Sequence, residues 1–271
     1  TVAEYDRALC IGRELNKLND QRRATERAIA AQAIELAEQS GMTGEDRRAI
    51  VLAAEGWSPG VIGIVCSRLV ERYHRPTLLL QRDNGVCQGS GRSIDGFSLH
   101  AALESCADML DRFGGHDMAA GLAVQTDRFA AFADRFIAIA NEKLSAAELT
   151  PTLRIDCDAT LDELDPDSVR QLDRIGPFGP SNPTPSVLVR SVRLVGAEPL
   201  GAHGKHLALR VQAERRAMRV VAWSWGERRS AMRIGEEIEM VVEPKLSTWA
   251  TRRGGSPTVE PVLADLRFVR G

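Results

Sequence analysis

"AIVLAAEGWSPGVIGIVCSRLVERYHRPTLLLQ" (residues 49–81) predicts a strand, a helix and a second strand in succession. The apolar runs over 49–54 and 76–81 are short, as buried strands are. Between them Ser58 and Pro59 supply an N-cap and a first-turn proline, and apolar residues then recur at helical spacing as far as Tyr73. This order of elements indicates an α/β domain.

Further elements of the same kind follow. "DNG" (83–85) is a hairpin signal before a third strand, "VCQGS" (86–90), and "AAGLAVQ" (119–125) predicts a fourth. Ser98 can cap a helix with apolar positions at Leu99, Ala102, Leu103, Cys106, Leu110 and Phe113. A last helix carries Phe129, Phe132, Phe136, Ile139 and Leu144. We therefore predict an α/β domain with a mixed sheet over residues 46–148.

The flanking segments differ from this domain. Residues 3–38 lack proline and predict one long helix, or two in line, ending at Ser40-Gly41, so residues 1–45 are expected to be a connecting helix. Residues 149–185 form an acidic, proline-rich connection with a short helix over 166–174 and the irregular loop "GPFGPSNPTP". Residues 186–271 contain about five short β runs between turns, which predicts an OB-fold barrel.

The composition is that of a soluble globular protein, with 44% hydrophobic and 27% charged residues and a net charge of −2. Neither a signal peptide nor an apolar run of the ~20 residues that span a bilayer is visible, so we expect a cytoplasmic protein without a membrane partner. The five cysteines are scattered and form no CxxC pair, which indicates reduced thiols rather than a disulfide framework or a zinc site. The chain begins with Thr1 rather than Met, which we interpret as an excised fragment.

Residues 201–271 carry thirteen basic and eight acidic side chains, and arginine suits bidentate phosphate contacts.

"QGSGRSIDGFSLH" (88–100) combines glycines, hydroxyls and an arginine. Gly89 and Gly91 could expose backbone N–H groups as an anion-binding nest. Ser90 and Ser93 add hydroxyl donors, and Arg92 adds a planar fork that fits a phosphate. The alternative is an ordinary Gly/Ser hairpin turn with one surface arginine.

"FGGHDMAAG" (113–121) contains more than a helix end requires. Gly114 follows Phe113 as the glycine after a helix does. Gly115 and His116 suggest a close approach by a ligand, with the imidazole near a phosphate or a base. A hydrogen-bonded loop histidine is the simpler alternative.

The last domain offers basic and aromatic side chains for a groove that follows a nucleic-acid strand. His203 and His206 are close in sequence, but their position in a turn argues against a metal site. Trp249 belongs to the same set of candidates, and some of the tryptophans in that set are expected to be core residues. The predicted single-strand contacts are Lys205, Arg215, Arg216, Arg219, Trp223, Trp225, Arg252 and Arg253.

Several motifs together resemble one family. "GWSPGVIGIVCSRLVERYHRP", "GSGRSIDGFSLHAAL", "FGGHDMAAGL" and "GPFGPSNPTP" occur in the order and spacing of the C-terminal half of the RecJ family of single-stranded-DNA-specific exonucleases. "ELNKLNDQRRATE" resembles the helix that joins that family's two core domains. The resemblance covers essentially the whole chain. It implies a linker helix, a DHH-associated α/β domain and an OB-fold domain.

The activity that the resemblance implies is metal-dependent 5′→3′ hydrolysis of single-stranded DNA in repair and recombination. Two divalent ions, Mn²⁺ or Mg²⁺, activate water in this family and are held by Asp and His residues of a preceding DHH domain. No DHH triplet occurs in this sequence. We therefore expect the chain to hold no metal and to be inactive alone, with that DHH domain, single-stranded DNA and a single-strand-binding protein as partners.

The resemblance also assigns individual residues. It implies that Ser90, Arg92 and Ser93 bind the 5′-terminal phosphate, beside Gly89 and Gly91. His116 would be catalytic and face the scissile phosphate, with Gly114 and Gly115 allowing close approach. Two positions depart from the family pattern: Ser58 replaces a common histidine, and Asp117 replaces a small residue and puts a negative charge beside the proposed phosphate site.

Two alternatives remain open at this point. One is a non-catalytic single-strand-binding accessory module, which the lack of a DHH domain upstream in the same gene would favour. The other is a related phosphodiesterase for short oligonucleotides or cyclic dinucleotides. Such enzymes generally lack an OB domain, so residues 186–271 argue against it.

Overall fold

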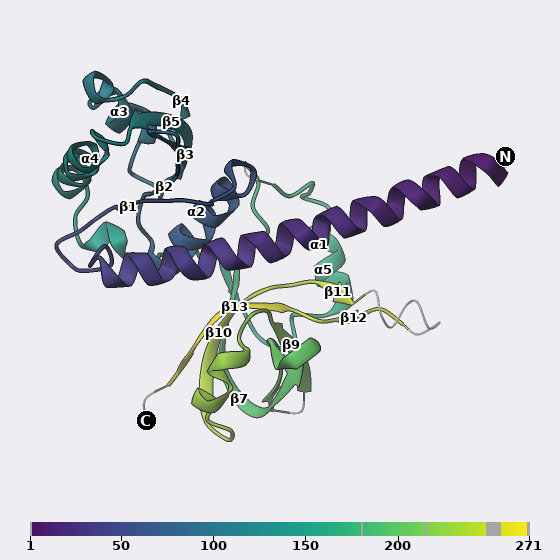
Figure 1. The fold of residues 1–271 in the computed structure, drawn as a ribbon. Helices are drawn as coiled ribbons and strands as arrows, with labels where there is room; N and C mark the ends of the chain where they lie inside the picture. Colours follow the sequence, from purple (N-terminus) through teal and green to yellow (C-terminus); the bar gives the residue numbers. More distant parts are fainter. Residues whose placement is uncertain (1, 180, 215, 248–255, 270–271) are drawn as a thin grey trace. The chain divides into compact units, whose positions relative to one another are not determined.

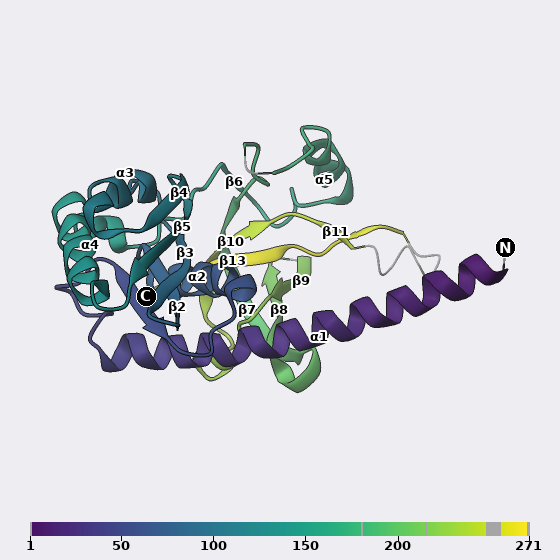
Figure 2. The ribbon, with the colours of Figure 1, turned by 45° about the horizontal axis from the view of Figure 1, so that its top comes forward.

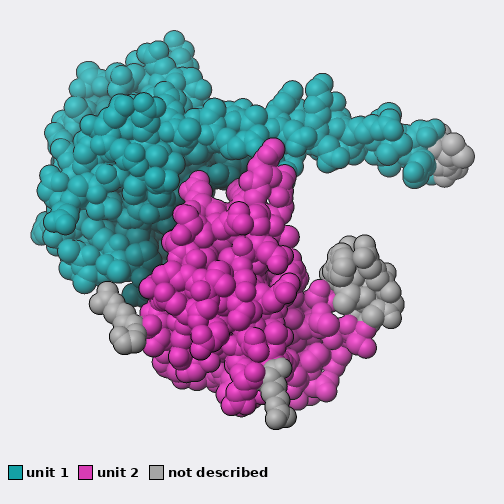
Figure 3. All heavy atoms as spheres, turned by 90° about the horizontal axis from the view of Figure 1, so that it is seen from below, with its two compact units in different colours: residues 1–152 teal, residues 153–271 magenta. Residues whose placement is uncertain are grey.

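The structure is a computed structural model that describes residues 2–179, 181–214, 216–247 and 256–269. The chain divides into two compact units, residues 1–152 and 153–271 (Figure 3). Each unit is described by itself below.

The first unit begins with one long helix, α1 (Val2–Gln39), and continues as alternating strands and helices (Figure 1). Its strands are β1 (Ile50–Ala54), β2 (Thr77–Asp83), β3 (Val86–Arg92), β4 (Arg112–His116) and β5 (Ala119–Gln125). Its further helices are α2 (Pro59–Tyr73), α3 (Leu99–Glu104), η1 (Ala107–Met109), α4 (Phe129–Lys143) and η2 (Ala147–Leu149). Residues 3–38 therefore form one continuous helix, rather than two helices in line.

The five strands form one mixed sheet in the order β1-β2-β3-β5-β4. The β1–β2 pair is parallel, because α2 crosses over between the strands, and the other pairs are antiparallel. At the β2–β3 hairpin Asn84 and Gly85 both have positive φ, as a two-residue turn of this kind requires. The predicted α/β domain with a mixed sheet is therefore confirmed.

Helices cover the two faces of this sheet differently. One face packs against α3 and α4 in a core that includes Leu78, Leu122 and Phe136. The other packs against α2 and the second half of α1, through residues such as Leu79 and Ile62. Figure 2 shows α3 and α4 on one side of the strands and α2 on the other.

One predicted helix is wrong. The residues after Ser98 form a helix only to Glu104 and a short 3-10 turn at 107–109, and the chain then enters β4 at Arg112. Leu110 and Phe113 match the helical period, but they pack against the same core from the turn and the strand. Pairing with β5 outweighs the local periodicity here.

The second unit is a β-barrel with additions. Its strands are β6 (Cys157–Ala159), β7 (Val187–Leu200), β8 (His206–Ala213), β9 (Arg216–Ala222), β10 (Glu237–Glu243), β11 (Leu246–Ser247), β12 (Thr258–Val259) and β13 (Val262–Phe268). Its helices are α5 (Pro166–Asp173), η3 (Ala202–Gly204) and η4 (Gly226–Ala231). The strand order is β10-β13-β9-β8-β7-β6, and an additional β10–β7 pairing closes five strands into a ring. This arrangement agrees with the predicted OB fold.

The segment expected to be a connection contributes to this second unit. The predicted short helix is present as α5, and Asp165 caps it by accepting from the backbone N–H groups of Asp167 and Ser168 at 2.7 and 2.8 Å. In addition, β6 pairs with β7, and Leu161, Leu164 and Val169 are buried. The chain therefore joins the barrel core before residue 186.

Candidate nucleic-acid interface

The face of the first sheet that α2 covers is covered only in part. α2 packs on β2 and β3. On the same face β4 and β5 leave Arg112, Gly114, His116 and Gly121 exposed. This part of the sheet is the surface on which the predicted phosphate ligands meet.

Strand register brings those residues into rows. Arg92, Ala119 and His116 are paired across β3, β5 and β4, and Ser90, Gly121 and Gly114 form the next row. Paired residues of neighbouring strands point to the same face. Arg92 and Ser90 therefore lie on one side of this exposed surface and His116 on the other. The middle strand offers only small residues between them. We call this surface the trough.

The α2 helix positions Arg92. The guanidinium donates to the Gly91 carbonyl at 2.8 Å, and its Nη2 lies 3.0 Å from the place where a Cβ on Gly63 would stand. Gly63 thus lets the half-buried Arg92 side chain lie against the helix. Next to it, the Cys66 thiol donates to the Ser90 carbonyl at 3.1 Å, and burial raises the pKa of that thiol to about 12. Cys66 is a neutral packing group here.

Ser93 does not face the trough. It is 5% exposed, its hydroxyl donates to the Phe97 carbonyl at 2.6 Å, and its N–H donates to the Met118 carbonyl at 3.1 Å. These bonds hold the loop after β3. The predicted phosphate contact by Ser93 is therefore wrong in this structure, because the donors of Ser93 are already used.

The predicted nest at Gly89 and Gly91 is wrong as well, and so is a hairpin turn there. Both glycines lie inside β3, paired with β2 on one side and β5 on the other. A Cβ on Gly89 would lie 2.7 Å from the Cα of Leu80, and one on Gly91 would strike the Leu78 side chain. These glycines allow close strand and core packing.

Gly114 and Gly115 also differ from the prediction. Gly114 does not end a helix, because it lies in the middle of β4, where nothing approaches its Cα from the side. Gly115 has φ +139°, and a Cβ there would lie 2.6 Å from the Cα of Ala120. The close approach at Gly115 is therefore to β5. His116 ends β4 and is exposed.

Asp117 has a partner within the fold. Its carboxylate accepts from the Ser98 hydroxyl, and that hydroxyl oxygen accepts from the N–H of Ala101 in the first turn of α3. The negative charge is thus tied to a helix N-terminus, where it is stabilising.

Sequence reasoning missed two side chains of the trough. Gln88 lies on β3 one alternation before Ser90, and Arg112 lies opposite it at the start of β4. The Arg112 guanidinium donates to Gln88 Oε1 at 2.7 Å. Period-two alternation in "VCQGSGR" could have found Gln88. Arg112 was hidden by the incorrect helix.

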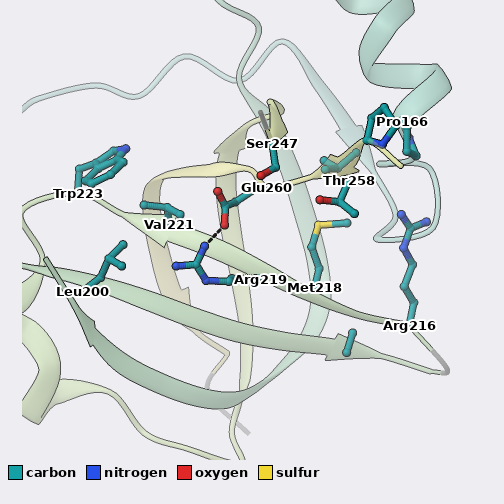
Figure 4. A pocket seen from close by; sticks show the side chains of 13 residues that line it. Pro166, Leu200, Arg216, Met218, Arg219, Val221, Trp223, Ser247, Thr258 and Glu260 are labelled. Atoms are coloured by element: carbon teal, nitrogen blue, oxygen red, sulfur yellow. Dashed lines mark ion pairs between the residues drawn. The ribbon is translucent and has the colours of Figure 1, made fainter. Parts of the chain in front are cut away.

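A groove of about 950 Å³ in the second unit contains three of the other predicted residues, Arg216, Arg219 and Trp223 (Figure 4). Trp223 is 52% exposed and lies edge-on to His206, with ring centroids 4.8 Å apart. Arg219 pairs with Glu260. Arg216 donates to the carbonyls of Asp162 and Leu164 at 2.6 and 3.0 Å.

The remaining predicted residues of this unit fall into three groups. Trp225 is 9% exposed, belongs to the barrel core and has Arg228 over its ring, so the prediction that it stacks on bases is wrong. Lys205 is exposed before β8 but does not line the groove. Four of the candidates lie outside the described residues: Arg215, Trp249, Arg252 and Arg253.

Within residues 2–179, 181–214, 216–247 and 256–269, no group of three or more His, Cys, Asp or Glu side chains could hold a metal ion. Among the helices described here, none is both long enough and apolar enough to cross a membrane.

Comparison with known families identifies both units. Residues 46–144 match the DHHA1 domain, and residues 155–256 match the RecJ OB domain. The class of protein is therefore a DHHA1 domain followed by an OB domain of the RecJ type.

Individual RecJ proteins are similar to this chain over most of its length. The single-stranded-DNA-specific exonuclease RecJ of Bacillus subtilis is 34% identical over 89% of this chain, and that of Thermus thermophilus is 35% identical over 94%. The crystal structure of RecJ in complex with Mn²⁺ from Thermus thermophilus matches 95% of this chain with a TM-score of 0.74 and 30% identity. The chain spans about a third of these proteins, 30%, 34% and 36% of their lengths. Over that part, the chain belongs to the RecJ family.

Proposed function

We propose that this chain is the substrate-binding part of a RecJ-type 5′→3′ exonuclease, which binds single-stranded DNA and its 5′-terminal phosphate. The observation that carries this proposal is the trough, where Ser90 and Arg92 face His116 across a floor of small residues. A hydroxyl and a guanidinium are suitable donors for a phosphate. An end group bound there would set the direction in which the strand is read.

His116 would lie beside the scissile phosphate. It is exposed and belongs to the same row as Arg92, so one strand can contact both side chains. Its role would be to hydrogen-bond a phosphate oxygen next to the terminal nucleotide.

The second unit would bind the strand farther along. Trp223 offers an exposed ring on which a base could stack. Arg219 offers a positive charge, but it would have to bind a phosphate while still paired with Glu260. Arg216 has a structural role through its two backbone carbonyls, so we expect it to contribute less to binding.

The catalytic metal would come from another part of the protein. We propose that Mn²⁺ or Mg²⁺ is held by a DHH domain that precedes α1, because RecJ of Thermus thermophilus is solved with Mn²⁺ and with Mg²⁺ and the relatives are about three times longer than this chain. The first half of α1 exposes Tyr5, Leu9, Ile11, Leu15 and Leu18, which such a domain could cover. The complete enzyme would act in DNA repair and recombination, with a single-strand-binding protein as a further partner.

Binding to end-labelled DNA tests the phosphate assignment. Fluorescence anisotropy would compare a single strand of about 20 nucleotides, labelled at its 3′ end, with a 5′-phosphate or a 5′-hydroxyl over a salt series. We expect the phosphate to tighten binding several-fold, and Arg92→Ala and Ser90→Ala to reduce that gain. Arg82→Ala is the matched control, because it removes an exposed arginine of β2 beside Phe129, on the opposite face.

Equal binding of both ends by the wild-type chain would contradict the assignment. If Arg92→Ala also left binding unchanged, binding would rest on the second unit. A second assay would add Mn²⁺ to the chain and follow the length of the DNA. We expect no shortening, and metal-dependent release of mononucleotides would overturn the proposed division of labour.

A further inference from the structure

The Arg112–Gln88 hydrogen bond crosses the trough. Gln88, Ala123 and Arg112 are paired across β3, β5 and β4, so the 2.7 Å bond between the two long side chains passes over the middle strand. Ala123, which lies beneath it, is only 3% exposed although both of its neighbours across the sheet are exposed. We call this pair the bridge.

The bridge lies at one end of the trough. Successive rows are two residues apart, about 6.7 Å along a strand. The row of the bridge is followed by the row of Ser90 and Gly114, and then by the row of Arg92 and His116. A hollow of about 270 Å³ lies against the bridge on the sheet. It is lined by Gln88, Gly89, Arg112, Phe113, Gly114, Gly121 and Leu122.

We infer that the bridge is an end wall, which makes the trough accept a terminal 5′-phosphate and reject a strand that continues beyond it. This inference rests on the proposed function of Ser90 and Arg92. A phosphate held by those residues would lie one to two rows from the bridge, so a group that continues from it along the trough would meet the hollow and then the bridge. A further group esterified to that phosphate would need the space that the bridge occupies.

The chemistry of the bridge suits this role. A guanidinium has five N–H donors, and the bond to Gln88 uses one of them. Arg112 can therefore keep the bridge closed and still donate to a phosphate. A phosphate monoester carries more negative charge than a diester, so the same cation favours a chain end over an internal linkage. Steric exclusion and charge act in the same direction.

Two oligonucleotides that differ only at the 5′ phosphate test the wall. One carries a free 5′-phosphate, and the other carries the same phosphate esterified to a propyl group. With the wild-type chain we expect about ten-fold weaker binding of the ester in the anisotropy assay. Gln88→Ala opens the wall and retains the positive charge, so we expect the difference to fall to about two-fold. Arg112→Ala should lower it similarly and also weaken binding of the free phosphate.

A neighbouring side-chain pair provides the control. Gln125 donates to Asp111 at 2.6 Å, one row beyond the bridge, so Gln125→Ala removes a comparable bond outside the trough. This variant should keep the wild-type discrimination. Gln88 and Arg112 are both exposed, and thermal unfolding would verify that their variants remain folded.

The outcomes separate the two proposals. If wild type prefers the phosphate to the hydroxyl but binds the ester equally well, the end wall is wrong and the phosphate site stands. Unchanged ten-fold discrimination in both Gln88→Ala and Arg112→Ala would also disprove the wall. If wild type does not distinguish phosphate from hydroxyl, the phosphate site fails and the wall fails with it.

Discussion

Gly114 and Gly115 are adjacent in β4, but the space around their Cα atoms differs. Gly115 has positive φ and touches the backbone of β5, whereas Gly114 has open space beside it and lines the trough. A glycine pair in a sequence does not reveal which member is required by packing. Here Gly115 is needed for pairing with β5, and Gly114 leaves the trough free of a side chain at that position.

We predict opposite effects for the two alanine variants. Gly115→Ala should lower the free energy of unfolding by about 1–3 kcal/mol, because it combines a strained φ with a clash against β5. Gly114→Ala should leave stability nearly unchanged but weaken binding of 5′-phosphorylated DNA. Urea unfolding and anisotropy on both variants would measure this, and equal stability losses would contradict it.

Thiol burial gives a second prediction at this scale. Cys66, Cys87 and Cys106 are buried, whereas Cys10 and Cys157 are exposed. Because thiolates are the reactive form, a disulfide reagent at pH 8 should modify the two exposed thiols quickly and the other three only after unfolding. Rapid modification of three or more thiols in the folded protein would contradict the structure.

The same burial predicts a pH effect. The pKa of Cys66 is raised from its ordinary value of 9.0 to about 12, so the unfolded chain releases this proton first. The stabilisation from burying the neutral thiol is complete below pH 9 and is lost as pH rises toward about 12. Urea unfolding at pH 8 and pH 10.5 should show a smaller loss for Cys66→Ala than for wild type.

At the scale of elements, one buried carboxylate joins α1 to α2. Glu26 is 4% exposed and pairs with Arg22 on its own helix at 2.8 Å and with Arg68 on α2. Farther along the same two helices, Glu38 contacts Arg72 and Tyr73 but is half exposed. The two contacts join the same helices but differ in solvent access.

Glu26→Ala should therefore cost about 1–2 kcal/mol of unfolding free energy, because charge-assisted bonds to a buried carboxylate are lost. Glu38→Ala, the exposed control on the same pair of helices, should cost well under half as much. Urea denaturation would decide, and equal effects would mean that burial of Glu26 does not strengthen its ion pairs.

At the scale of the whole molecule, the two units have separate cores. The helix-covered sheet of residues 1–152 contains two apolar clusters, one on each face, and the barrel of residues 153–271 contains a third. Each unit thus buries its own apolar residues, which is the condition for independent folding.

We predict that fragments 1–152 and 153–271 each unfold cooperatively when produced separately. The second fragment must begin near residue 153, because β6, Leu161 and Leu164 belong to the barrel. A fragment 186–271 should be less stable than 153–271 by circular dichroism melting. Equal melting temperatures would show that residues 153–185 do not support the barrel.

The sequence by itself determined the fold class, the family and most of the elements, because apolar periodicity, caps and turns are local properties, but it missed β4 and β6. Through the family resemblance it also predicted roles in substrate binding for Ser90, Arg92 and His116, and these three share one face of the sheet. Only the tertiary structure decided which face each residue joins. Strand pairing turned the expected nest into β3, brought Gln88 and Arg112 together from distant segments, and buried Ser93 and Trp225. Such contacts depend on which strands pair and in which register, and a one-residue change of register would move every side chain of a strand to the other face.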